Sequence, residues 1–466
     1  MCDGDLMADL VSCIPDHVQE VLRRLEGAGY QAVLVGGCVR DLILGREVQD
    51  WDVATDALPE RVRALFPRTV PTGIEHGTVT VVTKEGNVEV TTFRVESAYS
   101  DYRHPDQVAF TRDLRQDLGR RDFTINAMAL DLAGRLHDPF GGRHDLESRR
   151  LRAVGDPQAR FREDPLRLMR LVRFAAELDF RPEEETMEAA RRAAPLLRHI
   201  SAERIRDELS RILLSERPDF GLQLCLELGL LKVFLPELEE GVGVAQNVHH
   251  AYDVWTHALK ATAAIPPRLE LRLAALLHDV AKPRCLREEN GERHFYNHEL
   301  VGAAMVERIL RRLKFDRRTI ERVVHLVRHH MALHYQRGMT DAAIRRLINR
   351  VGLENMDDLL ALRRADREAS GVKRGPVSRG TARLLRRVEK VLAEDAAFGL
   401  GDLAVDGHDV MRIAGIEPGP EVGHILRRLL EAVLEDPKLN TRPALEDLIL
   451  EIARERGLPG PVESPR

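Results

Sequence analysis

The chain has 466 residues, 44% hydrophobic and 31% charged, which excludes a disordered protein and indicates two to four globular domains. No stretch has the length of an uninterrupted apolar membrane span and the acidic N-terminus argues against a secretory leader, so we expect a cytoplasmic protein without a membrane partner. The net charge of −5 excludes a positive electrostatic field around the whole protein. Any contact with nucleic acid must therefore come from a local basic surface.

Strand signals are concentrated between about residues 30 and 140. The runs rich in β-branched residues are 31–35, 78–83 and 88–92. The four residues from Lys84 to Asn87, between the last two runs, have the composition of a hairpin turn. Helices are predicted at about 16–27, 38–44 and 58–65. We therefore expect residues 1–145 to form an α/β head, with a small mixed sheet and covering helices.

Two glycines and two aspartates form the first candidate site. A strand runs into Gly36 and Gly37, and a second strand is predicted to carry Asp50 and Asp52. Glycines between a strand and a helix let the backbone approach a triphosphate, whose oxygens are favoured by the N–H groups of the helix start. Aspartates two apart on a strand face one side, and such like charges favour a bound cation. Mg²⁺ is expected because it prefers oxygen ligands.

Glu89 is a third candidate for this catalytic site. Its neighbours Val88 and Val90 are expected to point to the opposite face of their strand, so Glu89 can join the two aspartates from an adjacent strand. Three carboxylates can hold two metal ions that stabilise the attacking and leaving oxygens of an in-line displacement. A lone pair of aspartates is more often a solvated edge, but the glycine turn upstream favours the catalytic interpretation of all three acids.

The order of the motifs resembles that of a known family. The motifs are LVGGCVRD (34–41), DWD (50–52), RRDFTINAMALD (120–131), DPFGG (138–142) and EDPLRLMRLVRFAAEL (163–178). They are similar to the signature of class II tRNA nucleotidyltransferases and bacterial poly(A) polymerases, within the polymerase-beta superfamily. The resemblance implies an enzyme that adds C, C and A to the tRNA 3′ end from CTP and ATP without a template, releasing pyrophosphate.

The same resemblance implies roles for individual residues, with Asp50 and Asp52 binding Mg²⁺. The residues expected to contact the nucleotide are Gly36, Gly37, Arg40, Asp41, Arg121, Asp122, Asn126, Asp164, Arg167, Arg170 and Arg173. The polar stretch between Arg94 and Arg120 is expected to be a mobile loop beside the active site, which in the family helps to switch specificity from C to A. A CC-adding enzyme, an A-adding enzyme and a poly(A) polymerase are therefore alternatives.

Asp164 and Arg167 are predicted to select the nucleobase. They are three residues apart on a helix expected at 165–178, and are therefore neighbours on one face. A carboxylate accepts from the exocyclic amine of cytosine or adenine, while a guanidinium donates to the ring nitrogen beside it. Guanine and uracil place a carbonyl where the amine should be, and are rejected. The alternative is an intrahelical salt bridge without a functional role. The resemblance favours base selection.

Helical periodicity continues beyond residue 145, and we expect a helical neck at 146–240 that selects the nucleobase and binds RNA. A constellation of His and Asp residues follows within 241–370. Its members are His257, His278, Asp279 and Asp366, with His298 and His329 or His330 as further candidate ligands. The adjacent His and Asp follow an apolar run, where a buried ionisable pair is costly unless it binds something.

This pattern resembles the HD phosphohydrolase superfamily. His and carboxylate ligands from several helices suit Mn²⁺, Ni²⁺, Co²⁺ or Fe²⁺. The resemblance implies hydrolysis of phosphoesters by a metal-activated water. Two alternatives remain open: a metal-free domain that only packs or binds RNA, and a mainly hydrolytic protein whose head only holds RNA.

Residues 371–466 are expected to form a helical tRNA-binding region. Basic residues on these and the preceding helices can contact the phosphates of an A-form stem, so that shape rather than base sequence is recognised. The candidates are Arg363, Arg364, Lys373 and Arg374. The alternative for each is an ordinary solvated face. The sequence leaves both a monomer and a homodimer open.

Overall fold

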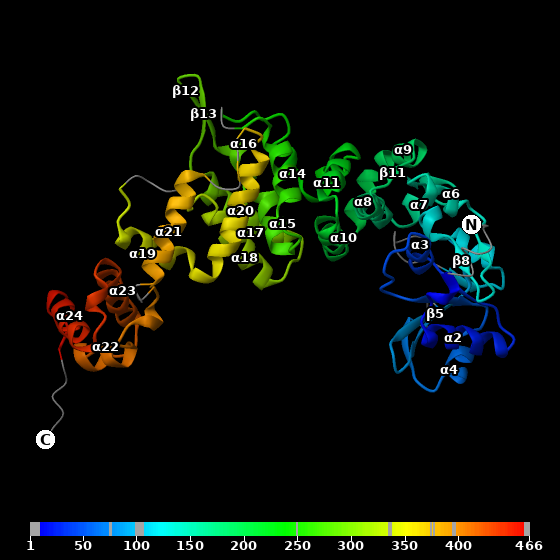
Figure 1. The fold of residues 1–466 in the computed structure, drawn as a ribbon, viewed down its shortest axis with the longest axis horizontal. Coiled ribbons are helices and arrows are strands. Elements are labelled where there is room, and N and C mark those ends of the chain that lie inside the picture. The colour runs from blue at the N-terminus through cyan, green and yellow to red at the C-terminus, as the bar shows by residue number, and fades with distance from the viewer. Residues whose placement is uncertain are drawn as a thin grey trace. The chain divides into compact units, whose positions relative to one another are not determined.

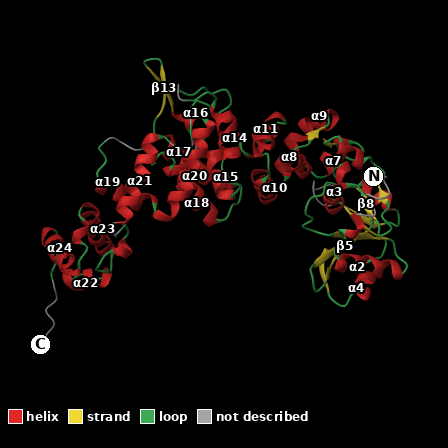
Figure 2. Cartoon of the chain, viewed as in Figure 1, coloured by secondary structure: helices red, strands yellow, loops and turns green. Residues whose placement is uncertain are grey.

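The computed structural model describes residues 10–73, 77–97, 107–247, 250–333, 338–372, 375, 378–393 and 398–460. The chain divides into two compact units, Met1–Glu240 with Ile309–Asp316 and Gly241–Arg308 with Arg317–Arg466. Apart from one hairpin, the strands belong to the first unit (Figure 1 and Figure 2). This confirms the predicted α/β head followed by a large helical region. Within the described residues, no helix is long and apolar enough to cross a membrane.

A seven-stranded mixed sheet forms the centre of the head, in the order β3-β4-β5-β2-β1-β8-β9. Its strands are β1 (Ala32–Val35), β2 (Asp52–Thr55), β3 (Thr69–Gly73), β4 (Thr78–Val82), β5 (Asn87–Thr92), β8 (Ala129–Leu130) and β9 (Leu136–His137). Strands β2 and β5 pair in parallel, and the other neighbouring pairs are antiparallel. Parallel pairing needs a crossover, which runs through α4 (Pro59–Leu65), β3 and β4.

Apolar side chains join the sheet to its helices. Strand β1 is buried along its whole length, whereas β5 alternates, with Val88 and Val90 buried and Glu89 exposed. Helix α2 (Asp16–Gly27) contacts β1 and buries a stripe at helical spacing that includes Val18 and Leu22. The alternation of β5 therefore turns Glu89 away from the core.

The first unit continues mainly as helices, with α8 packed against α7, α10 and α11. The elements are α3 (Gly37–Ile43), β6 (Arg94–Ser97), β7 (Gln107–Phe110), α5 (Leu114–Gly119), α6 (Gly142–Glu147), β10 (Arg150–Leu151), α7 (Pro157–Glu163), α8 (Leu166–Leu178), β11 (Arg181–Pro182), α9 (Glu184–Ala193), α10 (Ala202–Leu214), α11 (Pro218–Glu227), α12 (Leu231–Phe234) and α13 (Pro236–Glu239). The strands predicted at 31–35, 78–83 and 88–92 and the helices predicted at 16–27, 38–44 and 58–65 are confirmed to within one residue at each end.

The prediction of a loop between Arg94 and Arg120 is wrong for the described part of that stretch. Strands β6 and β7 pair as an antiparallel ribbon, and α5 follows them. Asp113 caps α5, because its side chain accepts from the backbone N–H of Arg115. Polar composition alone therefore did not exclude regular structure here. Residues 98–106 of the stretch lie outside the described residues.

The second unit is built around a helical bundle. Its central helices, which pack against one another, are α14 (Val254–Ala264), α15 (Leu269–Leu277), α18 (Arg317–His329) and α20 (Met356–Ala369). The other elements are α16 (Lys282–Cys285), β12 (Leu286–Glu289), β13 (Glu292–Phe295), α17 (His298–Arg312), α19 (Asp341–Val351), α21 (Arg379–Ala393), α22 (Gly407–Ala414), α23 (Pro420–Glu435) and α24 (Arg442–Glu455). Helices α22, α23 and α24 share an apolar core of their own.

Candidate active site

Three carboxylates lie together at the central parallel strand pair. Asp52 opens β2 and is the register partner of Glu89 in β5. Asp50 lies two residues ahead of β2, which corrects the prediction that it stands on the strand. Burial raises the pKa of Asp52 to about 6, and the Glu89 and Asp50 carboxylates add to this rise while Arg121 opposes it.

This cluster fits a divalent cation. Residues paired in parallel register point to the same face, so the carboxylates of Asp52 and Glu89 repel each other when both are ionised. Burial and, to a smaller extent, this repulsion raise the pKa of Asp52. A hard cation with oxygen ligands relieves both effects. The residues present therefore suit the expected metal.

Position 36 requires a glycine because of its backbone conformation and the close approach of Arg121. Its φ is 79°, in the region that favours glycine, and the chain then enters α3 at Gly37. A Cβ on Gly36 would lie 2.7 Å from Nη1 of Arg121 and 3.8 Å from Oδ2 of Asp52. The missing side chain therefore leaves room for the Arg121 guanidinium beside the Asp52 carboxylate.

Five polar residues of the predicted nucleotide site form one hydrogen-bonded network. Arg40 donates to the two oxygens of Asp41 at 2.9 and 2.7 Å, and to Oδ1 of Asn126 at 2.8 Å. Asn126 donates to Oδ1 of Asp122 at 3.2 Å, and Arg170 donates to Oδ2 of Asp122 at 2.7 Å. Burial raises the pKa of Asp122, but the neighbouring arginines outweigh burial and hold that pKa at about 2. Residues of three separate motifs are thus linked in a fixed arrangement.

Phe174 of α8 supports three of the predicted nucleotide-binding arginines. The guanidinium carbons of Arg40, Arg170 and Arg173 lie 5.1, 5.3 and 4.3 Å from the centroid of its ring. The ring in turn packs edge-on against Phe123, at a centroid distance of 5.8 Å. Guanidinium groups are attracted to an aromatic face, which limits their orientations. Sequence reasoning missed Phe174 because its spacing is that of an ordinary core residue.

Asp117 is a second residue that sequence reasoning missed. It is only 1% exposed, and its carboxylate lies 3.0 Å from Arg120 and 3.6 Å from Arg121. It also accepts from the backbone N–H of Arg94 at 3.2 Å. A buried carboxylate needs such partners, so Asp117 holds Arg121 near the glycine turn. The signal that identifies it is the spacing in RQDLGRRD, with two arginines three and four residues later.

The structure corrects the predicted neighbourhood of Asp164 and Arg167. Asp164 ends α7 with φ −138° and ψ 98°, an extended conformation that is favoured by the following Pro165. Its carboxylate accepts from Arg204 of α10 at 2.9 and 3.3 Å, and from the backbone N–H of Leu166 at 3.0 Å. Asp164 therefore lies in the turn before α8 and does not share a helix face with Arg167.

Arg167 also has partners of its own. Its Nη1 donates to Glu163 at 2.6 Å and to the carbonyl oxygen of Arg160 at 3.1 Å, and its Nη2 donates to the carbonyl oxygen of Arg120 at 3.0 Å. These bonds use three of the five N–H donors of a guanidinium. The two groups predicted to select the base are therefore held by separate neighbours. Sequence spacing could not indicate Arg204, which is 40 residues from its partner.

A second polar cluster lies inside the bundle of the second unit. His257, His278 and Asp366 form one group, and Asp279, His298 and His330 form another. Within each group the ligand atoms lie within 4.8 Å of one another, and all six residues are buried. The groups adjoin, because Oδ2 of Asp279 is 3.1 Å from Nε2 of His278. Predicted histidines and aspartates that lie on or directly after five helices, α14, α15, α17, α18 and α20, are thus brought together.

The backbone orients the histidines of this cluster. Nδ1 of His278, His298 and His330 lies 2.8, 2.8 and 2.6 Å from the carbonyl oxygen three residues earlier. Since a carbonyl only accepts, each Nδ1 carries a proton, and Nε2 of the neutral ring then has a lone pair that can bind a metal ion. Nε2 of His298 faces Nε2 of His330 at 3.2 Å. Two lone pairs at that distance repel, and a shared metal ion turns the repulsion into coordination. The donor set therefore fits a transition metal.

His330, and not His329, belongs to this cluster. Burial lowers the pKa of His330 to about 3, which keeps the ring neutral as a metal ligand must be. His329 is only partly buried, and its ring centroid lies 4.6 Å from that of His325. The prediction that names His329 is therefore wrong. Consecutive residues of a helical turn point about 100° apart, so only one of the two can face the centre of the bundle.

The structure also revises the predicted RNA contacts. Arg363 lies 2.9 Å from one carboxylate oxygen of Asp366, whose other oxygen faces His257 at 3.2 Å. Arg363 therefore orients a member of the buried cluster and does not present a free guanidinium to phosphate. Arg364 is exposed on α20. Lys373 and Arg374 lie outside the described residues.

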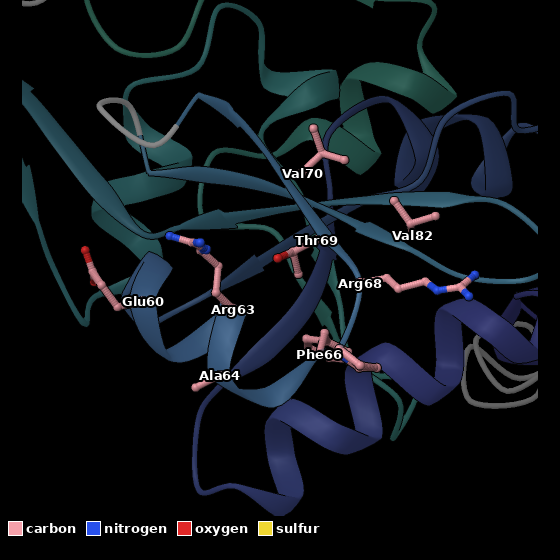
Figure 3. Close-up of a pocket in the computed structure, with 9 residues that line it drawn as sticks. Glu60, Arg63, Ala64, Phe66, Arg68, Thr69, Val70 and Val82 are labelled. Atoms are coloured by element: carbon pink, nitrogen blue, oxygen red, sulfur yellow. The ribbon is translucent and has the colours of Figure 1, made fainter.

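The head also contains a hollow of about 740 Å³ that is not lined by the residues of the carboxylate site. Its lining residues, shown in Figure 3, are Glu60, Arg63, Ala64, Phe66, Pro67, Arg68, Thr69, Val70 and Val82. The side chains of Arg63 and Arg68 extend in different directions (Figure 3). No set of ligating or like-charged groups converges among these lining residues, so the hollow is not part of the candidate active site.

Three family models match successive parts of the chain. They are described as poly A polymerase head domain (residues 32–152), probable RNA and SrmB-binding site of polymerase A (179–241) and tRNA nucleotidyltransferase domain 2 (299–449). The first match contains the glycine turn, the three carboxylates and every member of the network around Asp122 except Arg170. The second and third cover helical regions.

Several CCA-adding enzymes are similar to this chain. That of Lactococcus lactis subsp. cremoris (strain SK11) is 35% identical over 434 residues, which are 92% of this chain and 94% of the relative. That of Limosilactobacillus reuteri (strain DSM 20016) is 50% identical over 224 residues, 48% of this chain and 55% of the relative. The crystal structure of the Bacillus stearothermophilus CCA-adding enzyme in complex with CTP is 31% identical, with a TM-score of 0.71 and coverage of 95% and 99%. The Thermotoga maritima CCA-adding enzyme complexed with tRNA_CCA, 20% identical with a TM-score of 0.55 and coverage of 95% and 97%, shares the fold.

Proposed function

The chain belongs to the CCA-adding enzymes, the nucleotidyltransferases that add C, C and A to the tRNA 3′ end from CTP and ATP, and we propose that Asp50, Asp52 and Glu89 carry this reaction. The main support is the register pairing of Asp52 with Glu89 beside the Gly36 turn. The reaction uses a divalent metal, and we propose Mg²⁺ as that ion, held by Asp50 and Asp52 with Glu89.

The chain's own residues bind and orient the nucleotide. The turn at Gly36 allows the backbone to approach the triphosphate, and Arg121 lies beside that turn. Arg40 and Arg170 are fixed from both sides, by the Asp122 network and by the ring of Phe174, so they meet the phosphates in a prepared geometry. When bound, Mg²⁺ stabilises the negative charge on the attacking and leaving oxygens. Pyrophosphate then leaves against fixed positive charge.

We propose that Asp164 and Arg167 select the base as two separately held groups. Arg204 and the N–H of Leu166 hold the Asp164 carboxylate, whose oxygens retain lone pairs for an exocyclic amine. Arg167 keeps N–H donors beyond its three bonds for the ring nitrogen. Since the two groups are not paired with each other, an incoming base does not have to break a salt bridge between them.

We propose the following division of labour along the chain. Residues 1–145 form the catalytic head, 146–240 the base-selecting and RNA-binding neck, 241–370 the domain of the His and Asp cluster, and 371–466 a region that contacts tRNA. The similarity to CCA-adding enzymes over more than nine-tenths of the chain supports full CCA addition rather than CC addition, A addition or poly(A) synthesis. We further propose a cytoplasmic location, where tRNA and nucleotides are available.

The test is nucleotide addition to three tRNAs, ending before C, after one C and after CC. Each is incubated with Mg²⁺ and one of CTP, ATP, GTP or UTP, or with CTP and ATP together, and products are resolved at single-nucleotide length. We expect products that end at CCA and no use of GTP or UTP. Products that stop at CC, or addition of the last A alone, would identify a partial enzyme, and long A tails a poly(A) polymerase. No incorporation by folded protein with Mg²⁺ would refute the proposed head site.

We propose metal-dependent phosphoester hydrolysis as a second function, located in the second unit. Its support is the buried cluster in which Nε2 of His257 faces Nε2 of His278, and Nε2 of His298 faces Nε2 of His330, each at 3.2 Å. Nδ1 of His278, His298 and His330 is held by a backbone carbonyl. The proposed ligands are His257, His278, Asp279, His298, His330 and Asp366, and the proposed ions are Mn²⁺, Ni²⁺ or Co²⁺. When bound, such an ion activates a water toward phosphorus.

Replacing Asp279 by alanine is expected to weaken Mn²⁺ binding by more than about 100-fold and to abolish hydrolysis, because this carboxylate adjoins both groups of the cluster. Binding is measured by calorimetry on the full chain, and hydrolysis with a 2′,3′-cyclic nucleotide. Asp357→Ala, an exposed aspartate on α20, is the control and should bind Mn²⁺ like the native chain. Failure of the native chain to bind a transition metal would contradict the metal site, and binding without hydrolysis would contradict the second function.

A further inference from the structure

Four arginines line a second pocket of the first unit, with a volume of about 560 Å³. Arg149 and Arg150 lie at β10, Arg181 lies in β11, and Arg217 precedes α11. The other lining residues are Ser148, Asp179, Pro182, Glu183 and Phe220. We refer to this site as the arginine pocket. Its four guanidiniums outnumber its two carboxylates, in a chain whose net charge is negative.

Three of these guanidiniums have no acidic partner within the described part of the chain. Arg217 pairs with Asp179 at 2.9 Å. For Arg149, Arg150 and Arg181, in contrast, no ion pair or side-chain hydrogen bond joins them to any described residue. All three are exposed and border the same cavity. The pocket therefore offers a group of cations that the protein itself does not neutralise.

The backbone holds these charges together against their repulsion. Arg150 and Arg181 are register partners in the parallel β10–β11 pair, so their side chains start from the same face. Like charges paired in this way destabilise a sheet. Arg149 adds a third charge. Its backbone φ is 51°, in the left-handed region that residues other than Gly and Asn rarely adopt. An anion bound between them would relieve the repulsion.

The chemistry of the pocket identifies the anion. Guanidinium groups present paired N–H donors that match the oxygens of a phosphate. The partly buried ring of Phe220, 5.8 Å from the guanidinium carbon of Arg217, provides an apolar wall. We propose that the arginine pocket binds a phosphate group, supplied by the backbone of the RNA substrate. This inference rests on the proposed function and deepens it.

Helix α8 relates the pocket to the base-selecting residues. Asp164 precedes the first turn of α8, and Asp179 of the pocket follows its last turn. A helix of 13 residues is about 20 Å long. A tRNA whose 3′ end lies at Asp164 therefore extends far enough to place a phosphate of its stem at the arginine pocket. Contacts of this kind position RNA without recognising its sequence.

The test removes two of the free charges in the full chain, as Arg150→Gln with Arg181→Gln. The dissociation constant for a tRNA that ends before C is measured by fluorescence anisotropy at several KCl concentrations. We expect binding that is roughly tenfold weaker, and a salt dependence reduced by about one to two counterions. The melting temperature should not fall, because the exchange removes two charges that repel each other. A second variant, Arg149→Gly, suits the positive φ and should weaken binding in the same direction.

The matched control is Arg63→Gln with Arg68→Gln. It also removes two positive charges from the first unit, but from the hollow of Figure 3. We expect its tRNA affinity and salt dependence to equal those of the native chain. Titration with inorganic pyrophosphate distinguishes the source of the phosphate. If the pocket variant loses pyrophosphate affinity while its tRNA affinity is unchanged, RNA as the source is refuted. If tRNA and pyrophosphate affinities both equal those of the control, the site itself is refuted. Binding is measured without catalysis, so a failure of nucleotide addition remains a separate result.

Discussion

Asp52→Asn is expected to slow nucleotide addition by about 10³-fold or more while leaving tRNA binding in place. Asp52 is the least exposed of the three carboxylates and the register partner of Glu89, so its loss removes one charge from the centre of the proposed metal site. Loss of several kcal/mol of stabilisation at the reacting oxygens corresponds to a rate change of this size. The measurement is single-turnover addition of C to a tRNA that ends before C, over a range of Mg²⁺ concentrations.

The control for this experiment is the other proposed metal site. Asp279→Ala should add nucleotides at the native rate, because Asp279 lies in the bundle of the second unit and contacts no residue of the head among those described. Asp52→Asn should in turn retain any hydrolytic activity. A native rate for Asp52→Asn would contradict the catalytic assignment. Loss of addition in Asp279→Ala would contradict the independence of the two sites.

Asp164→Ala is expected to reduce the discrimination of CTP over UTP by about 10²-fold. The variant loses the acceptor for the exocyclic amine of cytosine, and it also loses the charge that the carbonyl of uracil would face. The measurement is kcat/KM for each of the four nucleotides with a tRNA that ends before C. Asp164→Asn provides a sharper version, since its amide can donate to a carbonyl and should improve the use of UTP further.

A control must separate selection from local structure, because Asp164 also accepts from the N–H of Leu166 at the start of α8. Asp156 caps α7 in the same manner, by accepting from the N–H of Gln158, and has no proposed contact with the base. Asp156→Ala should lower the melting temperature and leave the nucleotide preference unchanged. An equal loss for all four nucleotides in Asp164→Ala would show a structural role instead of a selective one.

The sequence predicted the orientation of Glu89 and the position of the glycine turn correctly, because both follow from local rules. Strand alternation places Glu89 opposite to Val88 and Val90, and a glycine turn after an apolar strand identifies Gly36. The prediction that Asp164 and Arg167 share one helix face was wrong, because helical spacing was extended across Pro165, which favours an extended conformation at Asp164. The motif identifies Asp164 and Arg167, but Pro165 sets the backbone conformation of Asp164 and hence the direction of its side chain.

The residues that were missed act through long-range contacts. Arg204 reaches Asp164 from another helix, and Phe174 is apolar in an apolar stripe. No local pattern distinguishes such a platform from a core residue. In the second unit the ligand types were predicted, but the choice between His329 and His330 depends on which one faces the bundle. The apolar periodicity of a helix does not decide which of two consecutive residues faces the core.

The parallel pairing of β2 with β5 also has a consequence for folding. Asp52 and Glu89 become neighbours only after the chain has closed a loop through α4, β3 and β4. Loop closure costs conformational entropy before the contacts within the loop are gained, whereas the β4–β5 hairpin forms from residues close in sequence. The carboxylates are therefore expected to come together late, and a chain with only its local hairpins and helices has no metal site. Catalytic competence thus depends on the completed topology of the head.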